Sequence, residues 1–136
     1  MDYVKQQIHC LSSRQTGLTG RGIGVAVLDT GAYPHQDFKE RITVFKDIIR
    51  GRRDAYDDNS HGTHVCGIIG GDGRACGGRF QGMAPECGLI CVKVLDKKGN
   101  GFASDVLSGL RWVRENRERY GIRIVNISVG SFNRKV

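Results

Sequence analysis

The 136-residue sequence predicts an α/β fold in which helices flank a parallel β-sheet, as in an incomplete three-layer α/β/α arrangement. Helix and strand patterns alternate along the chain, and such alternation is typical of right-handed βαβ crossovers. The segment 23–28 is apolar throughout, which is typical of a strand buried on both faces inside a parallel sheet. Asp29 follows this strand, at the end where open α/β sheets place their functional sites.

The other elements are predicted from the spacing of apolar residues. Ser60 precedes the second helix and is expected to cap it by accepting a hydrogen bond from a first-turn N–H group. Apolar residues recur at helical intervals in Val4, Ile8 and Leu11, in Val65, Ile68 and Ile69, and in Val106, Leu107, Leu110 and Val113. In chain order, we expect a helix over 2–12, strands over 23–28 and 42–45, a helix over 60–70, a strand over 88–95, a helix over 104–120 and a strand over 122–127.

Composition and charge argue against several classes of function. The chain has 21 Lys and Arg and 14 Asp and Glu, which gives a net charge of +7. The basic residues are scattered and most have acidic neighbours, so they indicate a solvated surface, and no nucleic-acid partner is expected. No long apolar run occurs, so neither a transmembrane helix nor a membrane partner is expected.

The five cysteines indicate reduced thiols in the core. Their number is odd, no Cys-x-x-Cys pair occurs, and Cys87 and Cys91 alternate with apolar residues along a predicted strand. The N-terminus also shows no apolar segment of a signal peptide, so a cytoplasmic location is expected. A zinc site built from Cys76, Cys87 and Cys91 stays open, although its spacing is poor.

Asp29 and His61 are the best candidates for catalysis. The first lies at the end of a buried strand and the second lies in the first turn of a predicted helix. A carboxylate can fix the tautomer of a histidine and stabilise the imidazolium that forms when the histidine takes a proton. The pair therefore predicts the Asp–His half of a nucleophilic triad. Its nucleophile is missing, because Ser104, Ser108 and Ser128 have no nucleophile-like context and no Gly-x-Ser-x-Gly motif occurs.

Other interpretations of the same residues stay open. His61 can simply be a polar residue at the start of a helix. His61 and His64 lie at positions i and i+3 of one helix, so together with Asp57 and Asp58 they can be arranged around a metal ion. No glutamate lies between the two histidines, as it does in the helix of a zinc protease.

Two short motifs suggest other classes of protein. The Asp-Thr-Gly triplet at 29–31 also occurs in aspartic proteases, but that fold is all-β and the amphipathic helices argue against it. The glycines of the segment 20–24 are spaced like a dinucleotide-binding loop. They precede the strand, whereas a phosphate loop must follow a strand and open a helix, so this interpretation is rejected.

Several motifs, taken in order along the chain, resemble the subtilisin-like serine proteases, or subtilases. They are VAVLDTG (25–31), HGTHV (61–65), GMAP (82–85), VKVL (92–95) followed by GNG (99–101), and NISVG (126–130). Their number and order make the resemblance specific, and it covers nearly the whole chain. Cysteine-containing sequences of this kind are more similar to the intracellular branch of the family than to the secreted one.

The resemblance implies roles for individual residues. Asp29 and His61 match the aspartate and histidine of the catalytic triad, whereas His64 matches no catalytic position and is expected to be structural. Asp37 matches a carboxylate of a calcium site, but the loop over 72–80 that would supply further ligands differs in length and is basic. The expected substrate-binding residues are Gly99, Asn100 and Gly101, whose backbone would pair with an extended peptide, and Ser128, Val129 and Gly130, which would form one wall of the specificity pocket.

The sequence departs from the family pattern in one respect. The Gly-Thr-Ser nucleophile motif and the asparagine of the oxyanion hole are absent, and the resemblance implies that both lie beyond residue 136. Residues 1–136 are therefore expected to be a single partial domain, the N-terminal portion of a serine endopeptidase domain, and to be inactive alone. The alternative is a non-catalytic module that binds peptides. The strand over 122–127 is expected to form an exposed sheet edge through which the chain associates with itself.

Overall fold

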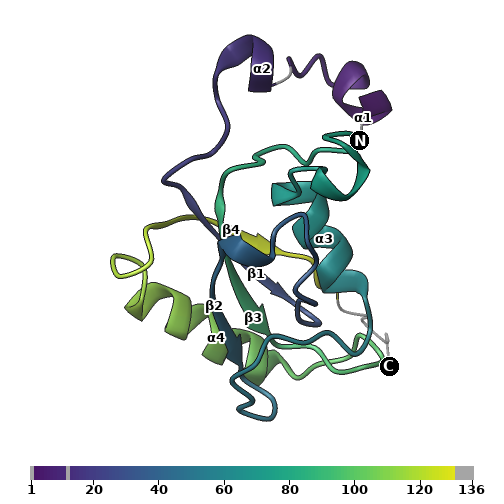
Figure 1. Cartoon of the computed structure of the whole chain (residues 1–136). Helices are drawn as coiled ribbons and strands as arrows, with labels where there is room; N and C mark the ends of the chain where they lie inside the picture. The colour runs from purple at the N-terminus through teal and green to yellow at the C-terminus, as the bar shows by residue number, and fades with distance from the viewer. Residues whose placement is uncertain (1, 12, 131–136) are drawn as a thin grey trace.

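The computed structural model describes residues 2–11 and 13–130, and these residues form one parallel four-stranded sheet (Figure 1). The strand order is β2-β3-β1-β4, and all three strand pairs are parallel. The apolar run that predicted an internal strand is confirmed, because β1 lies between β3 and β4. The strands are β1 (Gly24–Asp29), β2 (Ile42–Asp47), β3 (Gly88–Lys93) and β4 (Ile122–Ile127).

Helices α3 (His61–Gly70) and α4 (Ala103–Glu115) cover opposite faces of the sheet (Figure 1). Successive residues of β1 alternate between two apolar clusters, and each fully buried Val or Leu contributes roughly 1.5–3 kcal/mol. The predicted α/β class with flanking helices is therefore confirmed. The cluster on the α3 face includes Val25, Val27, Leu89, Cys91 and Cys66, and the cluster on the α4 face includes Ala26, Leu28, Ile90, Val92 and Val113.

The predicted N-terminal helix over 2–12 is wrong in its length. The structure has a short α1 (Asp2–Gln7) and a separate α2 (Ser13–Thr16), and His9 between them has a left-handed φ of 53°. The apolar stripe that predicted a longer helix remains exposed to solvent. Helices this short depend on tertiary packing for their stability, and this stripe packs against no core.

The predicted helix over 104–120 also ends early, at Glu115. The side chain of Asn116 turns back and donates a hydrogen bond to the carbonyl of Trp112, at 2.9 Å. The chain then turns through Gly121, whose φ is 59°, into β4.

The predicted strand over 42–45 extends to Asp47, whose carboxylate accepts the N–H groups that follow it.

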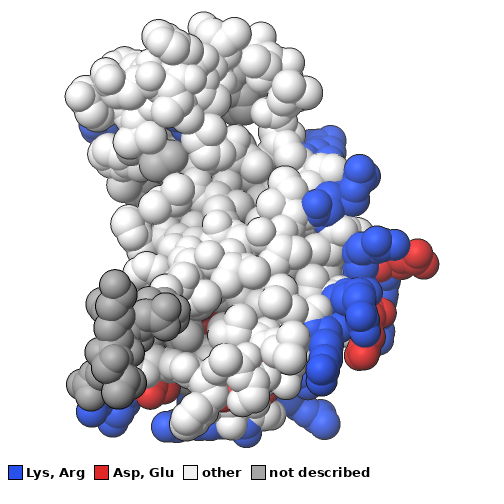
Figure 2. Space-filling model, turned by 180° about the vertical axis from the view of Figure 1, so that it is seen from behind, with Lys and Arg blue, Asp and Glu red and all other residues white. Residues whose placement is uncertain are grey.

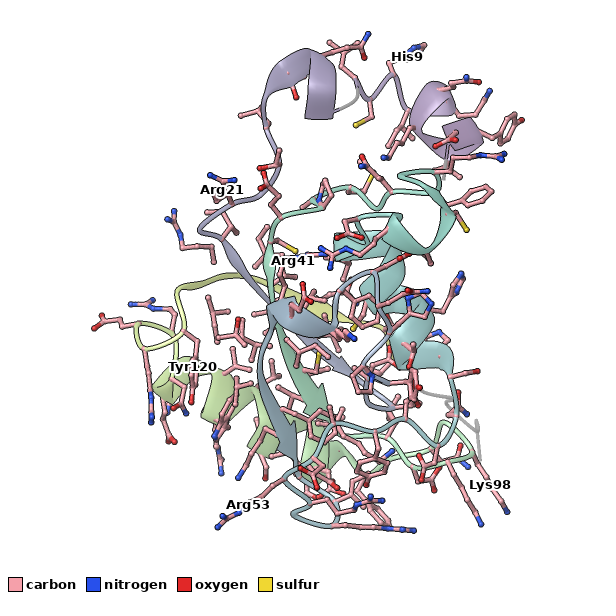
Figure 3. The ribbon with its side chains drawn as sticks, in the orientation of Figure 1. His9, Arg21, Arg41, Arg53, Lys98 and Tyr120 are labelled. Atoms are coloured by element: carbon pink, nitrogen blue, oxygen red, sulfur yellow. The ribbon has the colours of Figure 1, made fainter. Side chains whose placement is uncertain are left out.

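Arg41 fastens three segments on the α3 side of the molecule. Its guanidinium donates to the backbone carbonyls of Asp37, Gly70 and Cys87, and it points into the molecule beside α3 (Figure 3). The loop before β2, the end of α3 and the start of β3 are thereby joined.

Two further short helices are 3₁₀ turns, η1 (Lys39–Arg41) and η2 (Arg74–Cys76).

Most Lys and Arg side chains lie on the surface, and in Figure 2 they gather along one side with acidic residues among them. This distribution agrees with a solvated surface.

The edge strand β4 exposes apolar side chains. Ile124, Val125 and Ile127 are 54%, 42% and 43% exposed, and β4 pairs only with β1 in the described sheet. Unpaired apolar edges promote association, so self-association through β4 stays a prediction.

Within the described part of the chain, every helix is too short or too polar to cross a bilayer.

The cysteines are free thiols, as predicted, but only three of the five lie in the core. Cys66, Cys87 and Cys91 are buried, whereas Cys76 is exposed on η2. Burial raises the pKa of the Cys87 thiol, which disfavours the reactive thiolate. Cys76 does not join Cys87 and Cys91 in a metal-binding cluster, and residues 2–11 and 13–130 contain no group of three or more His, Cys, Asp or Glu suited to a metal ion.

Candidate active site

Asp29 and His61 meet at the carboxyl end of the sheet. Asp29 is the last residue of β1 and is fully buried, and His61 is the first residue of α3. The imidazole Nδ1 lies 2.8 Å from Oδ1 and 3.0 Å from Oδ2 of Asp29. Since a carboxylate can only accept, this contact assigns the proton of a neutral imidazole to Nδ1. The His61 side chain is half exposed, and no described residue hydrogen-bonds to its Nε2.

The predicted capping role of Ser60 is wrong. Ser60 has a left-handed φ of 88°, and its side chain makes no capping hydrogen bond. The neighbouring Asn59 does this instead, because its Oδ1 accepts the N–H of His61 at 3.1 Å. Its amide nitrogen also donates to the carbonyl of Lys97 at 2.9 Å. Asn59 therefore ties the start of α3 to the turn that follows β3.

Two more acceptors complete the first turn of α3, and both come from outside the helix. The Thr30 hydroxyl accepts the N–H of Gly62, and the carboxylate of Asp57 accepts the N–H of Thr63, each at 2.9 Å. The same Thr30 hydroxyl donates to Asp57 Oδ1 at 2.9 Å. Because Thr30 directly follows Asp29, this network fixes the end of β1 against the start of α3.

Asp57 is an ionised carboxylate at the centre of this network. Burial alone would raise its pKa, but hydrogen bonds from the Thr63 hydroxyl and from the N–H groups of Ser60, Thr63 and Asn59 outweigh burial and hold the pKa below its ordinary value.

Asp47 behaves in the same way at the end of β2. Burial opposes ionisation, but donors that include the Tyr56 hydroxyl outweigh it and lower the pKa of Asp47. The Tyr56 hydroxyl lies 2.6 Å from Asp47 Oδ2, and burial followed by this contact raises the pKa of Tyr56 to about 12.

The chain is expected to lose stability as the pH falls below about 4. Asp47 and Asp57 have lowered pKa values in the folded state, so their contribution is fully present above the unfolded value of about 3.9 and is lost as the pH falls through the folded values. Urea unfolding at about pH 6 and about pH 3 measures this loss. An Asp57→Asn variant should show a smaller difference in unfolding free energy between the two pH values. Equal wild-type stability at both would contradict the assignment.

The candidate substrate-binding residues Gly99, Asn100 and Gly101 form an exposed turn after β3. Asp96 organises this turn, because its N–H donates to the carbonyl of Asn100 and its Oδ1 accepts the N–H groups of Lys98 and Asn100. These backbone contacts lower the pKa of Asp96. The link from Asn59 to the adjacent Lys97 brings the turn into the same framework as His61.

Ser128, Val129 and Gly130 follow β4 at the carboxyl edge of the sheet. Ile127, the last residue of β4, pairs with Leu28, so Ser128 directly follows the strand beside the one that ends in Asp29. The Ser128 hydroxyl accepts a hydrogen bond from the side chain of Asn126 at 2.9 Å. The three residues are exposed, on the opposite side of β1 from the turn that follows β3.

Asp37 lies away from the Asp29–His61 pair, against the loop that contains η2. Its Oδ1 accepts the N–H of Ala75 at 2.7 Å, and its carbonyl accepts the N–H of Asp72 at 3.0 Å. Within the same loop, the Arg74 guanidinium lies 3.1 Å from Asp72 and 2.9 Å from Glu40. Calcium takes six to eight oxygen ligands. N–H and guanidinium donors contact these carboxylates instead, so this arrangement does not fit a calcium ion.

The alternative metal site is not assembled either. His61 contacts Asp29, Asp57 accepts hydrogen bonds from its neighbours, and Asp58 pairs with the ammonium of Lys93 at 2.8 Å. His64 is exposed on α3. In the described residues, His61, Asp57 and Asp58 therefore face different partners, and His64 joins none of them.

The fold and the Asp29–His61 contact together describe an α/β protein in which a buried aspartate hydrogen-bonds to a histidine at the carboxyl end of a parallel sheet. A model of the subtilase family matches residues 20–136. The chain therefore belongs to the subtilase family.

Three relatives illustrate the similarity. Serine protease AprX of Bacillus subtilis (strain 168) is 43% identical over 116 residues, which is 83% of this chain and 26% of that protein. Subtilisin Savinase of Lederbergia lenta is 37% identical over 125 residues, or 92% of this chain and 44% of that protein. A crystal structure of a cold adapted subtilisin-like serine proteinase matches with a TM-score of 0.64 at 36% identity, covering 73% of this chain and 34% of that one. The chain thus spans less than half the length of each of these relatives.

Proposed function

We propose that this chain is the N-terminal part of a subtilisin-type serine endopeptidase domain, in which Asp29 and His61 are two members of the catalytic triad. The observation that carries the proposal is the hydrogen bond between His61 Nδ1 and the buried Asp29 carboxylate. The serine and the oxyanion-hole asparagine would come from the part of the domain that follows residue 136.

The proposed mechanism assigns one task to each group. With its Nδ1 proton bound to Asp29, neutral His61 presents Nε2 as the acceptor for the proton of the serine hydroxyl. Asp29 then stabilises the imidazolium that forms, and the proton passes from Nε2 to the leaving amine of the cleaved peptide. The half-exposed imidazole supports this role, because Nε2 must reach an incoming group.

The proposed substrate is an extended peptide. Gly99, Asn100 and Gly101 would pair with its backbone on one side, and Ser128, Val129 and Gly130 would border its side-chain pocket on the other. The positions of these two segments on opposite sides of β1 support the assignment. The link from Asn59 to Lys97 supports a fixed distance between the turn and His61.

A comparison of hydrolysis and binding tests the proposal. The full-length gene product should hydrolyse an unstructured casein substrate, and the 136-residue chain should not. Binding of an uncleaved peptide by the full-length product, with no hydrolysis at any enzyme concentration, would instead identify a non-catalytic peptide-binding module.

A further inference from the structure

Lys93 is a buried cation directly beneath the candidate active site. It is the last residue of β3 and is 1% exposed, and it is the only lysine or arginine among the buried residues of the described chain. Lysine is rarely buried unless its charge is paired. Here the ammonium donates to Asp58 Oδ1 at 2.8 Å, to the carbonyl of Leu95 at 2.7 Å and to the carbonyl of Thr30. All three N–H donors of the ammonium therefore have acceptors.

Lys93 lies in a row of charged residues across the sheet. The register pairs Lys93 with Asp29 on one side and with Asp47 on the other. Paired residues of neighbouring strands project to the same face of a sheet, so the three side chains share the α3 face. Asp29 and Asp47 are buried and Asp58 is half-buried, so Lys93 supplies positive charge where several carboxylates are withdrawn from water.

The contacts of Lys93 lead to the Asp29 carboxylate by way of Thr30. The Thr30 carbonyl accepts from the ammonium, and its own N–H donates to Asp29 Oδ1 at 2.7 Å. The backbone of the same strand end is fixed as well, because the N–H groups of Val94 and Leu95 both donate to the carbonyl of Asp29. The peptide group that orients the carboxylate is thus held from the β3 side.

We propose that Lys93 is a positioning residue for the Asp29–His61 pair, anchored by Asp58 and acting through Thr30. Its ammonium holds the carbonyl of Thr30, the residue whose N–H donates to Asp29 Oδ1, and supplies the counter-charge to the buried carboxylate. Any catalytic consequence rests on the proposed function, but the effect on the imidazole does not. A purely structural lysine would affect the unfolding of the chain and leave the state of the imidazole unchanged.

The test reads the tautomer of His61 by ¹⁵N NMR of the 136-residue chain at a basic pH of about 8.5, roughly two units above the reference pKa of a histidine side chain. In the wild-type chain, Nδ1 should carry the proton. In Lys93→Met, the Nδ1–H form should fall from the dominant tautomer to the minor one. Lys98 lies on the exposed turn after β3 and projects into solvent, so Lys98→Met is the matched control and should keep the wild-type tautomer (Figure 3).

A second pair of variants keeps the test decisive if Lys93→Met does not fold. Asp58 is only half-buried, so its variants should be tolerated. Asp58→Ala removes an acceptor of the ammonium and should shift the tautomer in the same direction, whereas Asp58→Asn keeps an acceptor oxygen and should shift it less. An unchanged tautomer in folded Lys93→Met, or in Asp58→Ala where the first variant is unfolded, overturns the proposal. Because no hydrolysis is measured, a failure of the proposed function would leave this result standing.

Discussion

An Asp29→Asn variant of the full-length gene product is expected to lose a factor of roughly 10⁴ in kcat with little change in KM. This magnitude is the known effect of the same substitution in a serine protease triad, where the wrong histidine tautomer results. Subtilisin belongs to the family to which this chain belongs, and loss of its triad aspartate has an effect of similar size, about 3 × 10⁴.

The hydrogen bonds at Asp29 explain why an amide would be harmful at this position. Oδ1 accepts the N–H of Thr30 at 2.7 Å, so the single oxygen of an asparagine would stay with that donor. Its NH₂ group would then face His61 Nδ1 and force that nitrogen to accept. The proton would move to Nε2, the atom that must take the serine proton.

A matched substitution controls for the loss of one negative charge. Asp54 lies in an exposed part of the loop before α3, and Asp54→Asn should leave kcat within a factor of about 2 of wild type, as for an ordinary surface substitution. Steady-state kinetics on a peptide substrate measure both variants. A loss of less than about tenfold in Asp29→Asn, which corresponds to about 1.4 kcal/mol, would contradict the role proposed for this carboxylate.

A Gly62→Ala variant is expected to lower the free energy of unfolding of the chain by roughly 2–3 kcal/mol. A methyl group at Gly62 would collide with the backbone carbonyl of Gly31. The carbonyl cannot move aside easily, because Gly31 has a φ of 128° and itself approaches the carbonyl of Tyr56. Relief of the collision would separate the end of β1 from the start of α3, and with them Asp29 from His61.

Gly67 provides the control within the same helix. A methyl group there would meet no atom within 4 Å, and replacement of a helical glycine by alanine usually stabilises by roughly 0.5–1 kcal/mol. The free energy of unfolding measured by urea denaturation should therefore fall for Gly62→Ala and rise for Gly67→Ala. Similar unfolding free energies for the two variants would show that the contact between Gly62 and Gly31 is not as close as described.

Much of the fold follows from local sequence. The apolar run over 23–28 predicts an internal strand, and the spacing of Val65, Ile68 and Ile69 predicts α3, because burial repeats with the period of each element. Asp29 and His61 are predicted to pair because one ends a buried strand, the other begins a helix, and a carboxylate with a histidine makes the Asp–His half of a triad. By contrast, the helix over 2–12 is not completed, because its apolar stripe finds no partner, and packing partners cannot be seen in a local pattern.

The residues that support the site cannot be found from local sequence, because their roles depend on contacts between distant segments. Thr30 and Asp57 are 27 positions apart, and only folding brings the hydroxyl to the carboxylate. The polar run before His61 contains Asp57 and Asn59. Asp and Asn are favoured as helix-capping residues, so this run indicates residues other than Ser60 that can cap the helix. Lys93 likewise belongs only to a motif in the sequence, since nothing in its sequence neighbours indicates three acceptors around a buried ammonium.

The proposed triad is tested most directly by a serine-reactive fluorophosphonate probe applied to the full-length gene product. Covalent labelling requires an activated serine, and activation requires a base held as His61 is held by Asp29. We predict that the wild-type protein is labelled at one serine beyond residue 136, and that His61→Ala abolishes this labelling while the protein remains folded. Undiminished labelling of His61→Ala, or no labelling of the folded wild-type protein, would contradict the assignment.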